Sequence, residues 1–258
     1  MLNYISAEMY KLCHKKSLLV GMLLLLFLES WLFIPSFWVE ASPVEEAMLA
    51  FLIAVLPFGL FLAPAFAALI FDDQYGRDTL KNEVVFGIPR SRIYLGKLVA
   101  GMLVGTLCAA MAVGFYLAGC LLAGMMSPEP VLIETVAVEP LLWKLLLVDL
   151  VSSWLTWLAA LSFAVLIQFL FRGSAGALTI TYLVSFIGVP LGMIGTGDKA
   201  ALWVKAAVNL FYSAPYQTFY FGMERPGGAL GYAALIFLIW VGGATAVGLV
   251  AFHRREIK

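Results

Sequence analysis

The sequence predicts an all-α polytopic membrane protein, and three observations support that fold class. Of the 258 residues, 63% are hydrophobic and 12% are charged, against about 25% charged residues in an ordinary soluble domain. The mean hydropathy is +0.97. Six apolar stretches are each long enough for a helix that crosses a bilayer, which needs about 20 residues. This balance excludes a soluble globular enzyme, a disordered chain and a nucleic-acid-binding module.

The six predicted transmembrane helices are separated by short connections. None of these reaches the roughly 50 residues that a separate soluble domain needs. We therefore expect residues 1–258 to form a single transmembrane domain. The predicted spans are residues 17–39, 48–71, 97–126, 141–171, 174–195 and 229–252.

Two segments outside these spans have the composition of membrane-interface elements. In residues 1–16, apolar side chains recur at helical spacing among polar ones, which predicts an amphipathic helix lying along the interface. In the outer loop at residues 196–228, an apolar stretch too short to span is followed by several Tyr and Phe residues. Such stretches favour the membrane interface or re-enter the membrane. We expect a re-entrant outer segment there, between spans five and six.

The basic residues predict the orientation of the chain. Twelve of the sixteen Lys and Arg residues fall on the side that holds both termini. The positive-inside rule therefore places both termini in the cytoplasm. The other side carries the remaining four, Lys144, Lys199, Lys205 and Arg225.

The chain carries no recognisable catalytic or metal-binding set. A phosphate-binding P-loop needs G-x-x-x-x-G-K-[ST], and the nearest match, at Gly96-Lys97, lacks both the first Gly and the final Ser or Thr. The three cysteines form no CxxC pair, which argues against a zinc framework. Asp72, Asp73 and Asp78 could bind Mg²⁺ in a membrane-embedded transferase, but a second acidic cluster is missing on that side and a solvated loop explains them better.

Two carboxylates fall inside predicted spans, Glu29 in the first and Asp149 in the fourth. Counted at ~1.5 Å per residue from opposite membrane edges, they lie at similar depths. Intramembrane carboxylates are costly and normally face a bundle interior or a wet cavity, which makes both residues candidates for a transport path. The alternative is a protonated carboxyl group hydrogen-bonded to a neighbouring helix, because burial favours the neutral form.

The most informative segment is the loop at residues 72–96, between spans two and three, on the cytoplasmic side. Residues 79–86 can form a helix of two turns, which Gly87 and Pro89 end. The basic residues that follow, Arg90, Arg92 and Lys97, suit the lipid headgroups at the start of the third span.

The segment DTLKNEVVFGIPRSRIYLGKL in this loop resembles the cytoplasmic loop of type-2 ABC transporter permeases. That loop commonly reads as GT-x-K-N, an apolar stretch, G-x-x-R and a lysine that opens the third span. Here Asp78 replaces the Gly before Thr. The likeness covers the whole chain, from the interfacial leader and six spans to the long last outer loop. The residues that fall on the pattern are Thr79, Lys81, Asn82, Gly87, Arg90, Tyr94 and Lys97.

The resemblance implies a permease subunit of an ATP-driven ABC transporter in a bacterial plasma membrane, of the kind that exports a peptide, an antibiotic or another amphipathic compound. Such a subunit pairs with a second permease, identical or related, and binds a separate cytoplasmic ABC ATPase that holds the ATP and Mg²⁺. The permease itself holds no cofactor. The short helix would be the coupling helix, with the apolar side of Leu80, Val84 and Val85 docked on the ATPase. The implied coupling residues are Thr79, Leu80, Lys81, Asn82, Glu83, Val84 and Val85.

Two other function classes share the same hydropathy profile. One is a stand-alone secondary exporter or channel, and the other is the membrane-embedded transferase. The absence of a P-loop fits all three classes, whereas the cytoplasmic loop favours only the ABC permease.

Overall fold

The computed structural model describes residues 2–24, 26–27, 63–71, 79–126, 140–171, 175–184 and 226–254. All regular secondary structure in these residues is helical, as the sequence predicts. Three shorter helical segments cover residues 16–24, 63–71 and 175–184. The principal helices are α1 (Leu2–Cys13), α4 (Thr79–Val85), α5 (Arg90–Met126), α7 (Pro140–Leu170) and α11 (Pro226–Arg254).

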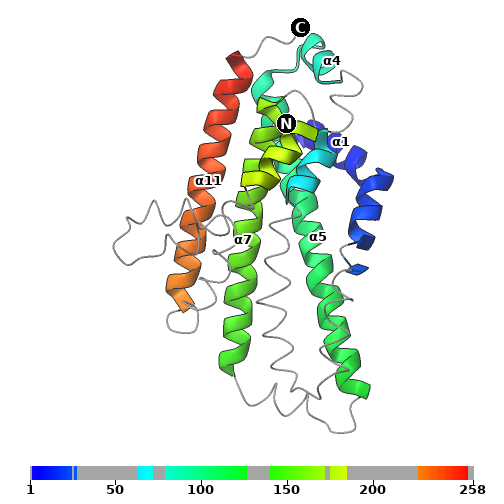
Figure 1. The fold of residues 1–258 in the computed structure, drawn as a ribbon, viewed down its shortest axis with the longest axis vertical. Helices are drawn as coiled ribbons and strands as arrows, with labels where there is room; N and C mark the ends of the chain where they lie inside the picture. The colour runs from blue at the N-terminus through cyan, green and yellow to red at the C-terminus, as the bar shows by residue number, and fades with distance from the viewer. Residues whose placement is uncertain are drawn as a thin grey trace.

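The three long helices α5, α7 and α11 run along the long axis of the molecule, with α7 between the other two (Figure 1). Each contains a segment long and apolar enough to cross a membrane, at Arg90–Phe115, Leu150–Leu170 and Leu230–Arg254. These segments coincide with the third, fourth and sixth predicted spans. The window in α7 is the most buried of the three, which agrees with its central position.

The other predicted spans are described only in part. The first is helical at residues 17–24 and 26–27, and the second at residues 63–71. The fifth contains a short apolar helix, Ala175–Val184. The remainder of these three spans, and the outer loop up to residue 225 with its predicted re-entrant segment, lie outside the described residues.

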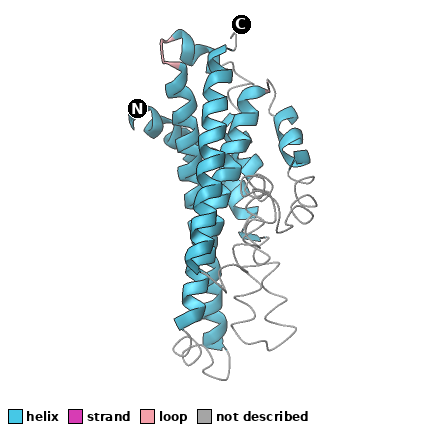
Figure 2. Ribbon diagram, turned by 90° about the vertical axis from the view of Figure 1, so that its left-hand side faces the viewer, coloured by secondary structure: helices cyan, strands magenta, loops and turns pink. Residues whose placement is uncertain are grey.

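The turn between α4 and α5 has a well-defined hydrogen-bond pattern. The Ile88 N–H donates to the Glu83 carbonyl at 3.3 Å, and the Gly87 N–H donates to the Val84 carbonyl at 3.0 Å. This pair of bonds is the Schellman motif, which needs a left-handed residue at the position of Gly87, whose φ is +79°. Pro89 then accepts the first hydrogen bonds of α5, from Arg92 and Ile93. Figure 2 shows the result as a short loop between two helices.

An aromatic cluster holds the long helices together near the α4 end of the bundle. The Phe169 ring of α7 lies 4.7 Å from the Phe71 ring, 4.7 Å from the Tyr94 ring and 4.9 Å from the Phe252 ring, measured between ring centroids. The Tyr94 hydroxyl donates to the Ala244 carbonyl at 3.0 Å. The Tyr94 ring occupies the position that a Cβ of residue 248 would take. Because Gly248 has no side chain, α5 and α11 can approach closely there. Aromatic pairs of this kind add about 0.5–1.5 kcal/mol each beyond their buried area.

Arg90 closes the end of α11. Its Nη1 donates to the carbonyl oxygens of Phe252 and His253, at 2.9 and 2.8 Å. These carbonyls belong to the last turn of α11, where helix carbonyls lack partners within the helix and attract positive charge. The first residue of α5 therefore caps the end of α11, and the two helices are fixed to each other at this end of the bundle.

Candidate functional site

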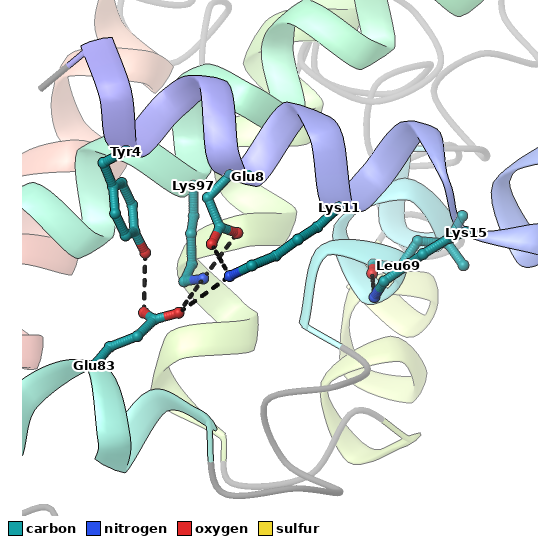
Figure 3. Close-up of polar contacts among 7 residues, drawn as sticks. All are labelled: Tyr4, Glu8, Lys11, Lys15, Leu69, Glu83 and Lys97. Carbon is teal, nitrogen blue, oxygen red and sulfur yellow. Dashed lines mark hydrogen bonds and ion pairs between the residues drawn. The ribbon is translucent and has the colours of Figure 1, made fainter.

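A buried lysine near the turn between α4 and α5 connects three helices. Lys97, in the second turn of α5, has a side chain that is only 1% exposed. Its Nζ lies 3.0 Å from Glu8 Oε2 of α1 and 3.4 Å from Glu83 Oε1 of α4 (Figure 3). One ammonium group is therefore shared by two carboxylates from two different helices.

Two further side chains of α1 complete the arrangement. The Tyr4 hydroxyl donates to Glu83 Oε2 at 2.9 Å. Lys11 Nζ lies 2.8 Å from Glu8 Oε1 and 3.9 Å from Glu83 Oε1 (Figure 3). We call Tyr4, Glu8, Lys11, Glu83 and Lys97 the Lys97 network. It contains two carboxylates and two ammonium groups, so its formal charges balance.

The helical repeat explains why α1 contributes three members. Tyr4, Glu8 and Lys11 are spaced at i, i+4 and i+7, which places them on one face of a helix. Leu12, one turn after Glu8, is buried in the hydrophobic core. The buried face of α1 therefore has a polar part and an apolar part. Its polar side chains contact Glu83 of α4 and Lys97 of α5.

Close packing fixes α1 against α5 at the network. A Cβ at Gly96 would overlap the Tyr4 ring, so the absence of a side chain at this position allows the ring to lie on the α5 backbone. Lys97 Nζ lies 5.8 Å from the centre of the same ring. Beyond the end of α1, Lys15 Nζ donates to the Leu69 carbonyl at 2.8 Å, at the end of the helical segment 63–71 (Figure 3).

The protonation states of the α1 members follow from these contacts. Burial alone would raise the pKa of Glu8, but the charge of Lys97 and the hydrogen bonds from Lys11 and Lys97 outweigh it, and the pKa lies below its ordinary value of 4.5. Glu8 is therefore an anion at neutral pH. Burial, together with the charges of Glu8 and Glu83, raises the pKa of Tyr4 far above its ordinary value of 10.0. Tyr4 thus remains a hydrogen-bond donor.

The short helix α4 buries Leu80, which was expected to lie on its exposed apolar side. Leu80 is only 8% exposed and belongs to the hydrophobic core of this chain, and Val84 packs against the same core. Glu83 points into the Lys97 network. Leu80 therefore packs on the core of this chain, whereas the docking role of Thr79–Val85 stays a prediction. Lys81, Asn82 and Val85 of α4 are exposed, as is Phe86 directly after it.

The two sequence-predicted transport-path residues stay predictions. Glu29 lies outside the described residues. Asp149 lies within α7, and its side chain is outside the described set. Thr79 is the first residue of α4. The pairing of Glu8 with Lys97 was not predicted, although a lysine at the start of a span and an acidic residue on the buried face of an amphipathic helix were both readable.

These features define a class of protein: a helical membrane bundle with a short helix at one end, tied by buried charges to a long span and to an N-terminal helix. A family model described as ABC-2 family transporter protein matches residues 4–188, which include α4, α5, α7 and α1 from residue 4 onward. The chain therefore belongs to the ABC-2 family of transporter proteins and is a transmembrane permease, as the loop sequence predicts. A search among curated proteins gave no match.

Proposed function

We propose that this chain is the permease subunit of an ATP-driven ABC transporter and that a separate cytoplasmic ATPase docks on the exposed side of α4. Family membership supports the permease role. The observation that supports the docking site is a pair of exposed apolar residues at the end of α4, where Val85 is 76% exposed and Phe86 is 83% exposed. The polar residues Lys81 and Asn82 border this pair and are also exposed.

Two adjacent exposed apolar side chains supply part of the binding free energy of an interface. Burying Val85 and Phe86 would contribute on the order of 3–6 kcal/mol before the costs of association. The opposite face of α4 is already packed on the core of this chain through Leu80. The packed face stabilises α4 when a partner binds the exposed face. The partner can therefore displace α4 as a folded helix.

The Lys97 network supplies the mechanical connection from α4 to the membrane. Glu83 of α4 is bound to Lys97 of α5 and to Tyr4 of α1. Displacement of α4 therefore has to move the second turn of a membrane-spanning helix, or break a buried ion pair. Separating Glu83 from Lys97 would remove one of the two carboxylate partners of an ammonium group that is 1% exposed, so movement of the three helices together is favoured.

The remaining parts of the proposal rest on the sequence. The transporter exports a peptide, an antibiotic or another amphipathic compound across a bacterial plasma membrane. The chain crosses that membrane six times with both termini in the cytoplasm, pairs with an identical or related permease, and leaves ATP and Mg²⁺ to the ATPase. Glu29 and Asp149 are the candidates for lining the path.

The docking site is tested by charge substitution on the exposed face. Val85→Asp and Phe86→Asp should abolish copurification of the ATPase subunit that the wild-type permease retains, because each places a carboxylate in the apolar contact. The control is Ser127→Asp, which adds the same charge in the predicted outer loop after the third span. It should leave copurification unchanged. Full ATPase retention by both α4 variants would contradict the docking site, and transport by the purified chain without any ATPase would contradict the permease-subunit role.

A further inference from the structure

A cavity of about 420 Å³ lies between α5 and α7, away from the Lys97 network. Among the described residues, α5 lines it with Thr106, Ala109, Ala110 and Gly114, and α7 lines it with Trp154 and Trp157. At ~1.5 Å per residue, Thr106 and Gly114 lie ~14 and ~26 Å further along α5 than Lys97. In a bilayer core of ~30 Å, the cavity therefore reaches into the half of the membrane remote from the network.

The residues that line the cavity offer a water molecule few hydrogen-bond partners. The Thr106 hydroxyl accepts a hydrogen bond from the Trp154 indole N–H at 3.1 Å and donates to the Met102 carbonyl at 2.8 Å. These two polar groups are therefore bonded within the protein. A water in a cavity needs about 2–4 polar partners, and cavities lined by apolar groups stay dry and take up hydrocarbons. The lining of this cavity therefore favours a hydrocarbon over water.

The cavity also borders the exposed surface of α5. Ala110 and Gly114 are exposed as well as lining, and Leu107 beside them is exposed too. A Cβ at Gly114 would meet nothing within 4 Å. Since a helix turns by about 100° per residue, Leu107, Ala110 and Gly114 share one strip of α5. A chain in the surrounding lipid could therefore enter from the side at this strip.

We propose that the cavity between α5 and α7 binds one acyl chain of a bilayer phospholipid. The volume suits it, because an apolar cavity of about 150 Å³ holds benzene, so 420 Å³ accommodates on the order of a dozen carbon atoms. The bilayer supplies such chains at the right depth and at high local concentration. The two indole rings provide broad apolar walls for a flexible chain. The phospholipid headgroup remains at the membrane surface, and the proposal does not depend on the partner ATPase.

Filling the cavity provides the test. Ala110→Phe and Gly114→Leu should each occupy the space of the chain, and Gly114→Leu meets no neighbour at its Cβ. In native mass spectrometry from mild detergent, both variants should retain one phospholipid fewer per protomer than the wild type. The control Leu238→Phe changes an exposed residue of α11, which is 66% exposed, and should retain the wild-type number.

A second readout locates the chain beside the tryptophans. In liposomes of phosphatidylcholine brominated on its acyl chains, Ala110→Phe should reduce quenching of tryptophan emission. The same substitution should have no effect in a Trp154→Phe/Trp157→Phe background. Unchanged phospholipid retention and unchanged quenching in both filled variants would overturn the proposal. Loss of transport with full phospholipid retention would also overturn it, because the cavity would then hold the apolar tail of a transported compound.

Discussion

Lys97 of α5 lies 3.0 Å from Glu8 of α1, and the two side chains are 1% and 5% exposed. This ion pair connects residues 89 positions apart in the sequence. It fixes the N-terminal helix to the start of a membrane-spanning helix, and Glu83 adds α4 to the same lysine at 3.4 Å.

Removing the shared lysine should destabilise this end of the protein. Lys97→Met removes the buried cation from Glu8 and Glu83 and leaves them only Lys11, whose side chain is 57% exposed. By the usual penalty for a broken buried pair, the loss is up to about 3–5 kcal/mol. The midpoint of thermal unfolding in detergent should fall clearly. Lys97→Met combined with Glu8→Gln should recover part of the loss, because Lys11 then has one carboxylate to balance instead of two. An unfolding midpoint equal to that of the wild type would show that the network does not stabilise the fold.

A methyl group at Gly96 should separate α1 from α5. Gly96→Ala places a Cβ inside the Tyr4 ring, so the ring and the start of α1 must move. Limited proteolysis should then cut the N-terminal segment faster than in the wild type. The matched control is Gly176→Ala, in a helix and with nothing within 4 Å of the new Cβ. It should be neutral or stabilising by up to about 1 kcal/mol, since Ala favours a helix over Gly. Equal proteolysis of Gly96→Ala and wild type would refute the contact.

Acid should release α1. The folded-state pKa of Glu8 lies below its ordinary value of 4.5, so Glu8 contributes stability that is fully present above that value. This stability is lost as the pH falls from about 4.5 through the folded-state pKa of Glu8. Access of a protease that is active in acid to α1 should therefore rise below pH 4.5. Glu8→Gln should show raised access already at neutral pH and a weaker pH dependence. A pH profile identical in the two proteins would exclude Glu8 as the responsible group.

The topology predicted from basic residues is open to direct labelling. Cysteines introduced at Ser42 and Ser127 should react with an impermeant reagent in intact cells, because the predicted topology places both in outer loops. The existing Cys13 should react only after the membrane is permeabilised. The reverse pattern would invert the orientation of the chain.

The local features of the site were predictable from sequence. Gly87 and Pro89 predict the end of the short helix, and the structure ends α4 at Val85 with Gly87 in the left-handed region. Hydropathy predicts that the third span begins at residue 97, whereas α5 begins at Arg90. The difference arises because hydropathy detects the membrane core, and a helix can extend beyond that core through basic residues.

The long-range features were not predictable. Glu8 and Lys97 each have an ordinary surface explanation in sequence, and only the packing of α1 on α5 brings them together. The burial of Leu80 has the same origin. A helix of seven residues has too few positions to show which of its apolar side chains faces the protein. The sequence groups Leu80 with Val85 on one apolar side, whereas in the structure Leu80 is buried and Val85 is exposed.

If α4 transmits force to α5 through Glu83 and Lys97, docking of the ATPase and transport can be separated in one variant. Glu83→Gln keeps the exposed face of α4 but weakens its tie to Lys97. Glu83→Gln should copurify the ATPase as the wild type does, while substrate-stimulated ATP hydrolysis and transport fall. The control Arg92→Gln, at an exposed position of α5, should change neither. Wild-type transport and stimulated hydrolysis in Glu83→Gln would contradict the account.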